Sequence, residues 1–346
     1  MRFEKIIEYF SNSVNSSEKY KPDLLIRYTY EFALSELSRD MLLRYFFTYI
    51  KIDINSTEAI DFDENLLDKL KDFADLLLNN FFVPLKPTGA KNPQPSSGNL
   101  STIRSIQGPH DFIGTPERVA NLCSLCLERD HHRCVLSQSF DYREAVRRIS
   151  EDLEEALDDE GVRLKGQSIV TLQVAHIIPH SLMQLDTSSG LSESKKTAIQ
   201  ILNMFDYDVG LIINGPDIDR PRNAISLTQT AHDAFSSFEI FLEPVDGQEH
   251  TYHIKTLKPC LAHVFGLPLT RKLFLSDNQS IEPPSPRLLA LHRAIAHILH
   301  LSGAGEYIDK ILRDFENTEI RDDGTTELGR MIHWRMGGGL DGAVVH

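Results

Sequence analysis

The chain has little of what a disulfide-stabilised or membrane-inserted protein needs. Only four of its 346 residues are cysteines, without a paired spacing, and one residue is a tryptophan. No apolar run approaches the length of about 20 residues that a membrane helix takes. The opening residues, MRFEKIIE, do not form an apolar leader. We therefore expect a protein that does not contact membranes and works in a reducing, intracellular compartment, either cytoplasm or nucleus.

Basic residues are also scarce, since 36 Lys and Arg face 50 Asp and Glu and the formal net charge is −14. Phosphate contacts supply most non-specific affinity for nucleic acids, so this balance argues against a broad nucleic-acid-binding surface. Basic side chains gather only locally, at Arg143, Arg147 and Arg148 on a predicted helix and at Arg220 and Arg222. The acidic run 151–160 is interpreted as a solvated helix face.

Three short segments nevertheless combine residue types that carry chemistry. His176 follows the β-prone run TLQVA and precedes IIP, where Pro179 would end a strand by removing a donor. Asn223 lies in RNAISLT, and His232 follows it after eight residues, in TAHDAF. Thr228 or Thr230 can cap a short helix that places His232 in its first turn and turns Phe235 toward the core.

These side chains suit the hydrolysis of a phosphodiester. An imidazole with an unperturbed pKa of about 6.5 can take a proton from water at neutral pH, and a neutral imidazole can bind a divalent metal. An Asn side chain in a turn-rich stretch can bind backbone groups and fix a loop. His176 is the candidate base, His232 the candidate metal ligand and Asn223 the candidate loop organiser.

A strand, a second strand and a helix that carry His, Asn and His in this order resemble the motif of the HNH endonuclease family. The sequences of the three segments are similar to those of its fungal HNH-domain proteins. The resemblance implies a ββα-metal finger in which His176 is the general base, Asn223 organises the loop and His232 binds a divalent metal, for which Mg²⁺ is favoured. It also implies a nucleic-acid substrate, with DNA favoured over RNA. No protein partner is indicated.

The sequence departs from the family pattern at Ala175, where many members carry a metal ligand directly before the base. Another residue near the finger would have to replace that ligand. The candidates are His180, Asp217, Asp219 and Asp233. The gap between His176 and Asn223 is also long for a compact finger, and its helical periodicity predicts a helical insertion.

The cysteines offer a competing site, a structural zinc bound by Cys123, Cys126 and Cys134 with His131 or His132. The spacing fits only in part, because no second cysteine pair follows the His-Asn-His core. Val119, Leu122 and Cys126 also recur at helical spacing, so we favour a core position for these thiols. The segment 129–137 resembles the opening hairpin of the fungal group.

The fold class predicted is α+β, with a helical N-terminal region, a ββα-metal core carrying the long insertion, an extra β-hairpin at 238–257, and C-terminal helices at 287–301 and 304–315. Histidines 292, 297 and 300 are interpreted as a partly exposed helix face. The predicted domains are a helical region 1–83, a linker 84–115 rich in Pro, Gly and Ser, an HNH nuclease-like domain 116–317, and a flexible tail 318–346.

Two functions are consistent with the sequence. The first is a metal-dependent endonuclease that hydrolyses nucleic-acid phosphodiester bonds. The second is a catalytically inactive module that keeps the HNH scaffold to bind protein or nucleic acid, which Ala175 and the acidic balance favour. Metal affinity would discriminate between them.

Overall fold

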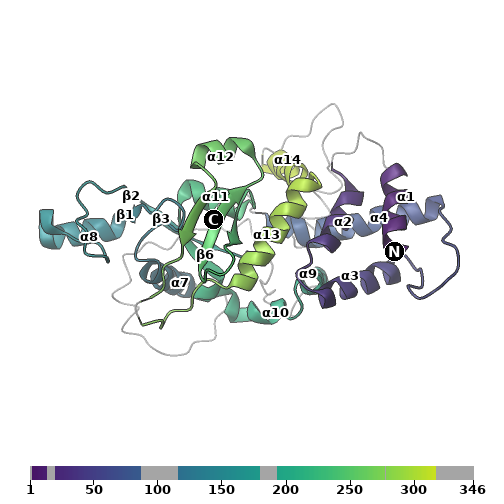
Figure 1. The fold of residues 1–346 in the computed structure, drawn as a ribbon, viewed down its shortest axis with the longest axis horizontal. Helices are drawn as coiled ribbons and strands as arrows, with labels where there is room; N and C mark the ends of the chain where they lie inside the picture. Colours follow the sequence, from purple (N-terminus) through teal and green to yellow (C-terminus); the bar gives the residue numbers. More distant parts are fainter. Residues whose placement is uncertain (1, 14–19, 87–115, 180–192, 277, 317–346) are drawn as a thin grey trace. The chain divides into compact units, whose positions relative to one another are not determined.

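The computed structural model describes residues 2–13, 20–86, 116–179, 193–276 and 278–316. The chain folds into two compact units that are not contiguous in sequence (Figure 1). Unit 1 contains residues 1–91, 185–211 and 294–346, and unit 2 contains residues 92–184 and 212–293. No helix within the described ranges is long and apolar enough to cross a membrane.

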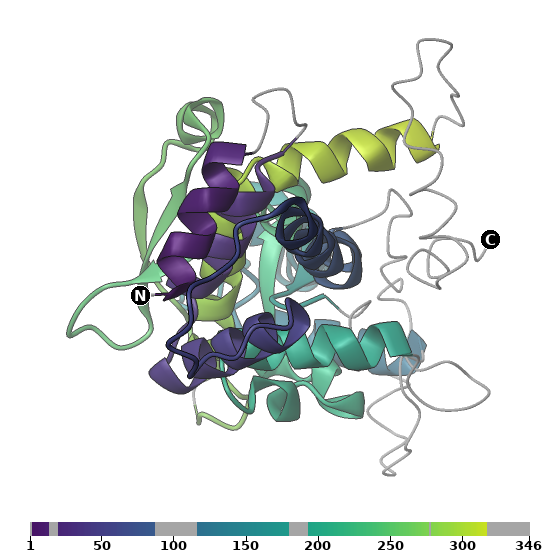
Figure 2. The same cartoon turned by 90° about the vertical axis from the view of Figure 1, so that its right-hand side faces the viewer.

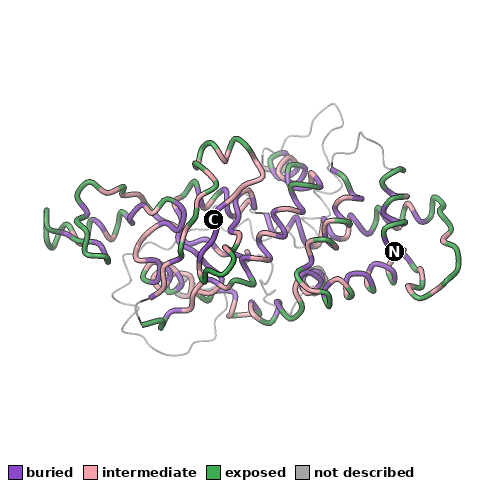
Figure 3. Tube along the Cα trace, viewed as in Figure 1, coloured by how far each residue is buried: buried purple, intermediate pink, exposed green. Residues whose placement is uncertain are grey.

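Unit 1 is helical, as predicted for the N-terminal region. Its helices bury their apolar faces at positions that recur once per turn (Figure 3). Ser35 and Asp63 cap α3 and α4 by accepting the backbone N–H of Ser38 and Leu66. The N-terminal elements are α1 (Arg2–Ser13), α2 (Pro22–Glu31), α3 (Glu36–Tyr49), α4 (Glu64–Leu77), the π-helical turn η1 (Leu78–Phe82) and α5 (Val83–Leu85).

The predicted helical insertion forms α9 (Glu193–Phe205), which belongs to unit 1. It packs against α3 and η1 (Figure 2), where Phe205 stacks on Phe81 with ring centroids 5.2 Å apart. The second half of α13 (Pro286–Leu301) and α14 (Ala304–Glu316) complete the unit, in agreement with the two predicted C-terminal helices. Helix α10 (Val209–Ile212) follows α9 and ends where unit 2 resumes.

The described residues of unit 2 combine helices with three small sheets, so the α+β class is confirmed. The parallel pair β1–β2, the antiparallel pair β3–β4 and the antiparallel sheet β5–β6–β7 follow one another along the chain. The strands are β1 (Phe140–Asp141), β2 (Ile169–Val170), β3 (Leu172–His176), β4 (Ala224–Thr228), β5 (Ile240–Pro244), β6 (Thr251–Thr256) and β7 (Leu269–Lys272). The helical elements are α7 (Pro116–Arg129), α8 (Tyr142–Asp152), η3 (Leu153–Glu155), η5 (Gly215–Asp219), η6 (Pro221–Asn223), α11 (Gln229–Ser236), α12 (Pro259–Phe265) and the first half of α13.

The structure differs from the prediction at three places. The predicted hairpin is present as β5 and β6, but β7 adds a third strand to it. The acidic run is not a helix face throughout, because α8 ends at Asp152 and Asp158 is buried, where it accepts hydrogen bonds from Arg133 and Gln167. His292 is buried rather than exposed.

Each predicted domain is one continuous stretch of sequence, whereas each compact unit is built from separate stretches. The predicted boundaries stay a prediction. Packed structure continues past residue 83, since α5 ends at Leu85 and Lys86 is buried and paired with Asp309 at 2.6 Å. The rest of the predicted linker, residues 87–115, and the predicted tail 318–346 lie outside the described residues.

Candidate active site

The strands β3 and β4 and the helix α11 form one ββα motif in unit 2. β3 pairs antiparallel with β4, so that His176, the last residue of β3, lies opposite Ala224, the first residue of β4. α11 begins directly after β4, where the Thr228 hydroxyl accepts the backbone N–H of Ala231 at 3.4 Å. α11 packs against both strands. This arrangement brings the segments of His176, Asn223 and His232 together.

His176 is the last residue of β3, and its ring contacts a carboxylate. The Nε2 atom of His176 is 3.1 Å from Oδ1 of Asp219, whose side chain is only 1% exposed. A carboxylate oxygen accepts, so the neutral ring donates from Nε2 and carries its lone pair on Nδ1. In this tautomer Nδ1 is the acceptor atom of the ring.

Asn223 is fully buried and ties together the two segments that carry this pair. Its Oδ1 accepts the N–H of Ile178 at 2.9 Å, and its Nδ2 donates to the carbonyls of Ile178 and Ile218 at 3.0 and 2.9 Å. Ile178 follows His176 by two residues, and Ile218 precedes Asp219. The amide thus fixes the backbone on both sides of the His176–Asp219 contact.

His232 lies on α11 near His176. Burial lowers the pKa of His232; Asp233 opposes that effect, and the proximity of His176 adds to it. Its Nδ1 is buried without a hydrogen-bond partner in the part of the chain that the structure describes, because Asp233 Oδ1 lies 3.7 Å away. A neutral imidazole with a buried nitrogen of this kind fits the donor that a divalent metal requires.

The other candidate ligands are less well placed for a metal. Asp233 is exposed and accepts a hydrogen bond from Gln229, Asp217 pairs with Arg220 and Arg222, and Asp219 holds His176. His180 lies outside the described residues. Ala175 is buried opposite Ile225 and offers no donor. In the described ranges, no group of three or more His, Cys, Asp or Glu could hold a metal ion.

Cys126 and Cys134 are buried and Cys123 is partly buried, whereas Cys260 is exposed. Cys126 on α7 packs with Leu122, Val174 and Ala224, and burial raises its pKa to about 12. Burial likewise raises the pKa of Cys123 to about 11. Both thiols are therefore protonated at neutral pH, as expected for cysteines packed among apolar side chains.

Cys134 is buried as well, and its sulfur accepts the backbone N–H groups of Ser137 and Thr228 at 3.3 and 3.4 Å. Thr228 ends β4 and caps α11. The hydrogen bond from its N–H to the Cys134 sulfur therefore stabilises the junction of β4 and α11. The structure therefore gives the sulfur a hydrogen-bonding role within the protein.

Sequence reasoning missed a buried ion pair beneath the motif. Arg129 has no exposed surface and donates to both carboxylate oxygens of Asp130 at 2.8 and 2.9 Å. It also donates to the carbonyls of Pro221 and Ala224, while Asp130 accepts the N–H of Ser226. The pair thus holds the start of β4 against the end of α7. Only the adjacent Arg and Asp could have suggested it, and adjacent opposite charges are common on surfaces.

The local basic groups are largely matched by carboxylates. Arg147 and Arg148 both pair with Glu144, and they pair in addition with Glu151 and Asp159. Near the motif, Glu282 lies 2.7 Å from Arg220 and 3.8 Å from Arg222. These arginines therefore present less net positive charge than the sequence suggested.

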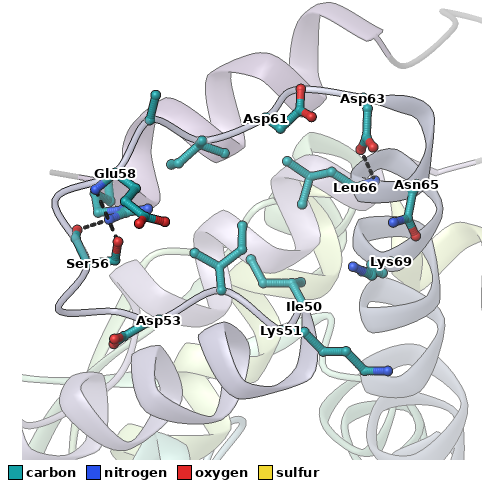
Figure 4. A pocket seen from close by; sticks show the side chains of 14 residues that line it. Ile50, Lys51, Asp53, Ser56, Glu58, Asp61, Asp63, Asn65, Leu66 and Lys69 are labelled. Carbon is teal, nitrogen blue, oxygen red and sulfur yellow. Dashed lines mark hydrogen bonds between the residues drawn. The ribbon is translucent and has the colours of Figure 1, made fainter.

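A hollow of about 300 Å³ lies in unit 1, away from these residues in the sequence (Figure 4). Acidic and basic side chains both line it, including Asp53, Glu58, Asp61, Lys51 and Lys69. Asp63 at its edge caps α4 through the N–H of Leu66. None of the site residues predicted from the sequence takes part in it.

Residues 145–243 match the family model described as HNH endonuclease. The match contains β3, β4 and α11 with His176, Asn223 and His232, and it also contains Asp219. The chain thus carries a domain of the HNH endonuclease family, as the resemblance predicted, whereas the narrower fungal group stays a prediction. Searches of the curated proteins and of the solved structures found no match.

Proposed function

We propose that this protein is a metal-dependent endonuclease whose active site is the junction of β3, β4 and α11. The observation that carries the proposal is the convergence of His176, whose ring contacts Asp219, and the half-buried His232 within a domain of the HNH endonuclease family. The family supports nuclease-type chemistry. The geometry supports a division of roles between the two histidines.

His176 is the proton acceptor in this proposal. It takes a proton from the attacking water at Nδ1, because Nε2 donates to Asp219. The imidazolium that forms is stabilised by the negative charge of that carboxylate, which also prevents rotation of the ring. Asn223 fixes the loop on which the pair depends.

His232 is the proposed metal ligand, and Mg²⁺ is the favoured ion. Such an ion would neutralise the charge on the phosphate and on the leaving oxygen. Mg²⁺ commonly keeps several waters and takes the substrate phosphate as a ligand, so a site with few protein donors is compatible with it. His232 stays neutral to lower pH than an ordinary histidine, which keeps it available as a donor.

The proposed substrate is nucleic acid, with DNA favoured over RNA. Because the arginines near the motif are paired with carboxylates and the net charge is −14, the metal has to contribute much of the attraction for phosphate. Cleavage should therefore depend strongly on the ion supplied and only weakly on salt, because few unpaired basic side chains are left to contact phosphate.

A second candidate, an inactive HNH scaffold that binds protein or nucleic acid, is favoured by one observation. Ala175 stands where a ligand is usual. On this alternative the protein would bind its target without cleaving it. The two candidates predict different results in one assay.

The assay is cleavage of supercoiled plasmid, single-stranded DNA and RNA at low salt with Mg²⁺, Mn²⁺ or Zn²⁺. We expect His176→Ala to lower the cleavage rate at least about 100-fold, since general base catalysis contributes that much, and to leave metal affinity unchanged. His232→Ala should weaken both. The control is His263→Ala, an exposed histidine on α12, which should behave as wild type.

Equal metal affinity in wild type and His232→Ala would contradict the role of His232. If wild type and His176→Ala are equally inactive on every substrate with every ion, the inactive scaffold is favoured instead.

A further inference from the structure

His292 is a buried histidine outside the residues that match the family. It lies on the first half of α13, within unit 2, and is 1% exposed. Its ring stacks on Phe235 with centroids 4.0 Å apart and an interplanar angle of 6°, and on Phe238 with centroids 4.5 Å apart. The imidazole thus packs against two aromatic rings. Phe235 lies in the last turn of α11, and Phe238 lies two residues after the helix ends.

The hydrogen bonds of this ring are uneven. Nε2 lies 3.0 Å from the carbonyl oxygen of Phe235, and because a carbonyl only accepts, the Nε2 atom must carry the proton. Burial lowers the pKa of His292 to about 3, so the ring is neutral. Nδ1 is buried and has no hydrogen-bond partner among the residues the structure describes.

A buried nitrogen without a partner lowers stability, and an apolar ring of similar shape would avoid that cost. The stacking alone therefore does not explain a histidine here, since phenylalanine would stack equally well. What phenylalanine would lose is the N–H donated to Phe235. The explanation for His292 must lie in what that hydrogen bond holds.

The bond holds the C-terminal end of α11. The Phe235 carbonyl also accepts the N–H of Phe238, whose φ of +60° places it in the left-handed region. At the other end, Thr228 caps the helix. A helix of this length is not stable by itself, so its position depends on such contacts. His232 lies between the two ends, three residues before Phe235.

We propose that His292 is a positioning residue, which holds α11 through the Phe235 carbonyl so that His232 faces the site beside His176. The inference rests on the proposed function, because it assigns His292 a task in the metal site. It adds a required residue from α13, beyond residues 145–243.

The experiment compares three proteins that separate the hydrogen bond from the packing. His292→Phe keeps an aromatic ring and removes the donor, whereas His292→Gln keeps an N–H at a similar place and removes the ring. For wild type and both variants, we would measure Mn²⁺ affinity, plasmid cleavage with Mn²⁺, and the free energy of unfolding in urea. The ring resonances of His232 would be recorded by NMR without metal.

His292→Phe should be at least as stable as wild type, yet bind Mn²⁺ about tenfold more weakly, as is typical when support of a ligand is lost. His292→Gln should be less stable but recover most of the affinity. The His232 resonances should shift in His292→Phe. In the background of His232→Ala, His292→Phe should cause no further loss of affinity.

Wild-type affinity and unshifted His232 resonances in His292→Phe would overturn the inference, while cleavage by wild type would leave the proposed nuclease standing. Loss of affinity in proportion to lost stability in both variants would also overturn it, since packing alone would explain that result. If wild type neither binds Mn²⁺ nor cleaves, the proposed function fails, and the His232 resonances alone decide whether His292 positions α11.

Discussion

At the residue scale, the contact between His176 and Asp219 gives a direct test of the proposed base. Asp219→Asn keeps an oxygen that can accept from Nε2 but removes the negative charge that stabilises the imidazolium. We expect the cleavage rate at saturating substrate to fall at least about tenfold, because a misplaced or unsupported base loses that much or more. The rate is measured by single-turnover plasmid cleavage.

The matched control is Asp246→Asn, which removes an exposed carboxylate in the turn between β5 and β6. It lowers the negative charge by the same amount but should leave the rate unchanged. If both variants lose the same activity, a general charge effect would account for the result. Unchanged activity in Asp219→Asn would mean that the carboxylate does not support the base.

The buried pair of Arg129 and Asp130 gives a prediction about stability. Asp130→Asn leaves the Arg129 guanidinium buried without its counter-charge, which should cost about 3–5 kcal/mol. Burial by itself lowers the pKa of Arg129, yet Asp130 and Cys126 raise it by more, so the guanidinium stays charged in the fold. The free energy of unfolding in urea measures the loss.

Glu151→Gln serves as the comparison, because it breaks an ion pair with Arg147 in which both side chains are more than half exposed. Exposed pairs contribute about 0–1 kcal/mol, so this variant should be close to wild type. Equal losses of unfolding free energy in the two variants would show that burial does not increase the contribution of the Arg129–Asp130 pair to stability.

At the scale of elements, the parts of the site that could be predicted are those set by neighbouring residues. The β-prone run before His176, the capping Thr228 and the inward-facing Phe235 each act within a few positions, and each lies where the local pattern indicates. The helical insertion and the C-terminal helices have the same local origin.

What could not be predicted depends on pairs of residues distant in sequence. Asp219 lies 43 positions from His176, and Phe235 lies 57 positions from His292. Neither contact has a local signal. β7 was missed because Leu-Thr-Arg-Lys has no apolar alternation, so its partner β6 defines it as a strand.

The contact between α11 and α13 should make stability depend on pH. His292 has a folded pKa of about 3, below its unfolded value of about 6.5. The unfolded chain therefore binds a proton that the folded protein does not, and the stability associated with a neutral His292 is present above pH 6.5 and lost as the pH falls toward 3. His232 acts in the same direction.

We therefore expect the difference in unfolding free energy between wild type and His292→Phe to move against wild type as the pH falls. Its slope should approach about 1.4 kcal/mol per pH unit, the value for one proton. Urea unfolding at several pH values between 8 and 4 measures it. A difference that does not change with pH would show that His292 is charged or exposed in the folded protein.

At the scale of the whole molecule, the chain order and the compact units do not coincide. The stretch between β3 and β4, which interrupts the motif in sequence, contributes α9 to unit 1. The two strands nevertheless pair in unit 2 with a register fixed from Leu172 to His176. The long gap between His176 and Asn223 is therefore compatible with a compact site, because the helix α9 within that gap belongs to unit 1.

Each unit has its own buried core, which leads to a prediction about where a core substitution acts. Phe205 has no exposed surface and packs on Phe81 and Phe82 within unit 1. Phe205→Ala should cost about 3–5 kcal/mol, the usual result of removing a buried aromatic ring. Hydrogen exchange followed by mass spectrometry should show faster exchange in α3, α9 and η1, because these are the elements around that ring.

Exchange in β3, β4 and α11 should stay at the wild-type rate, and so should Mn²⁺ affinity, since Phe205 belongs to unit 1 and the site residues belong to unit 2. Phe140→Ala is the reciprocal variant, because Phe140 is buried with Ala145, Ala156 and Leu164 in unit 2. It should speed exchange in β1, β2 and α8 and leave α3 and α9 unchanged. Equal acceleration in both units by either variant would contradict separate cores, and the α9 insertion would then have to be regarded as part of one cooperative nuclease fold.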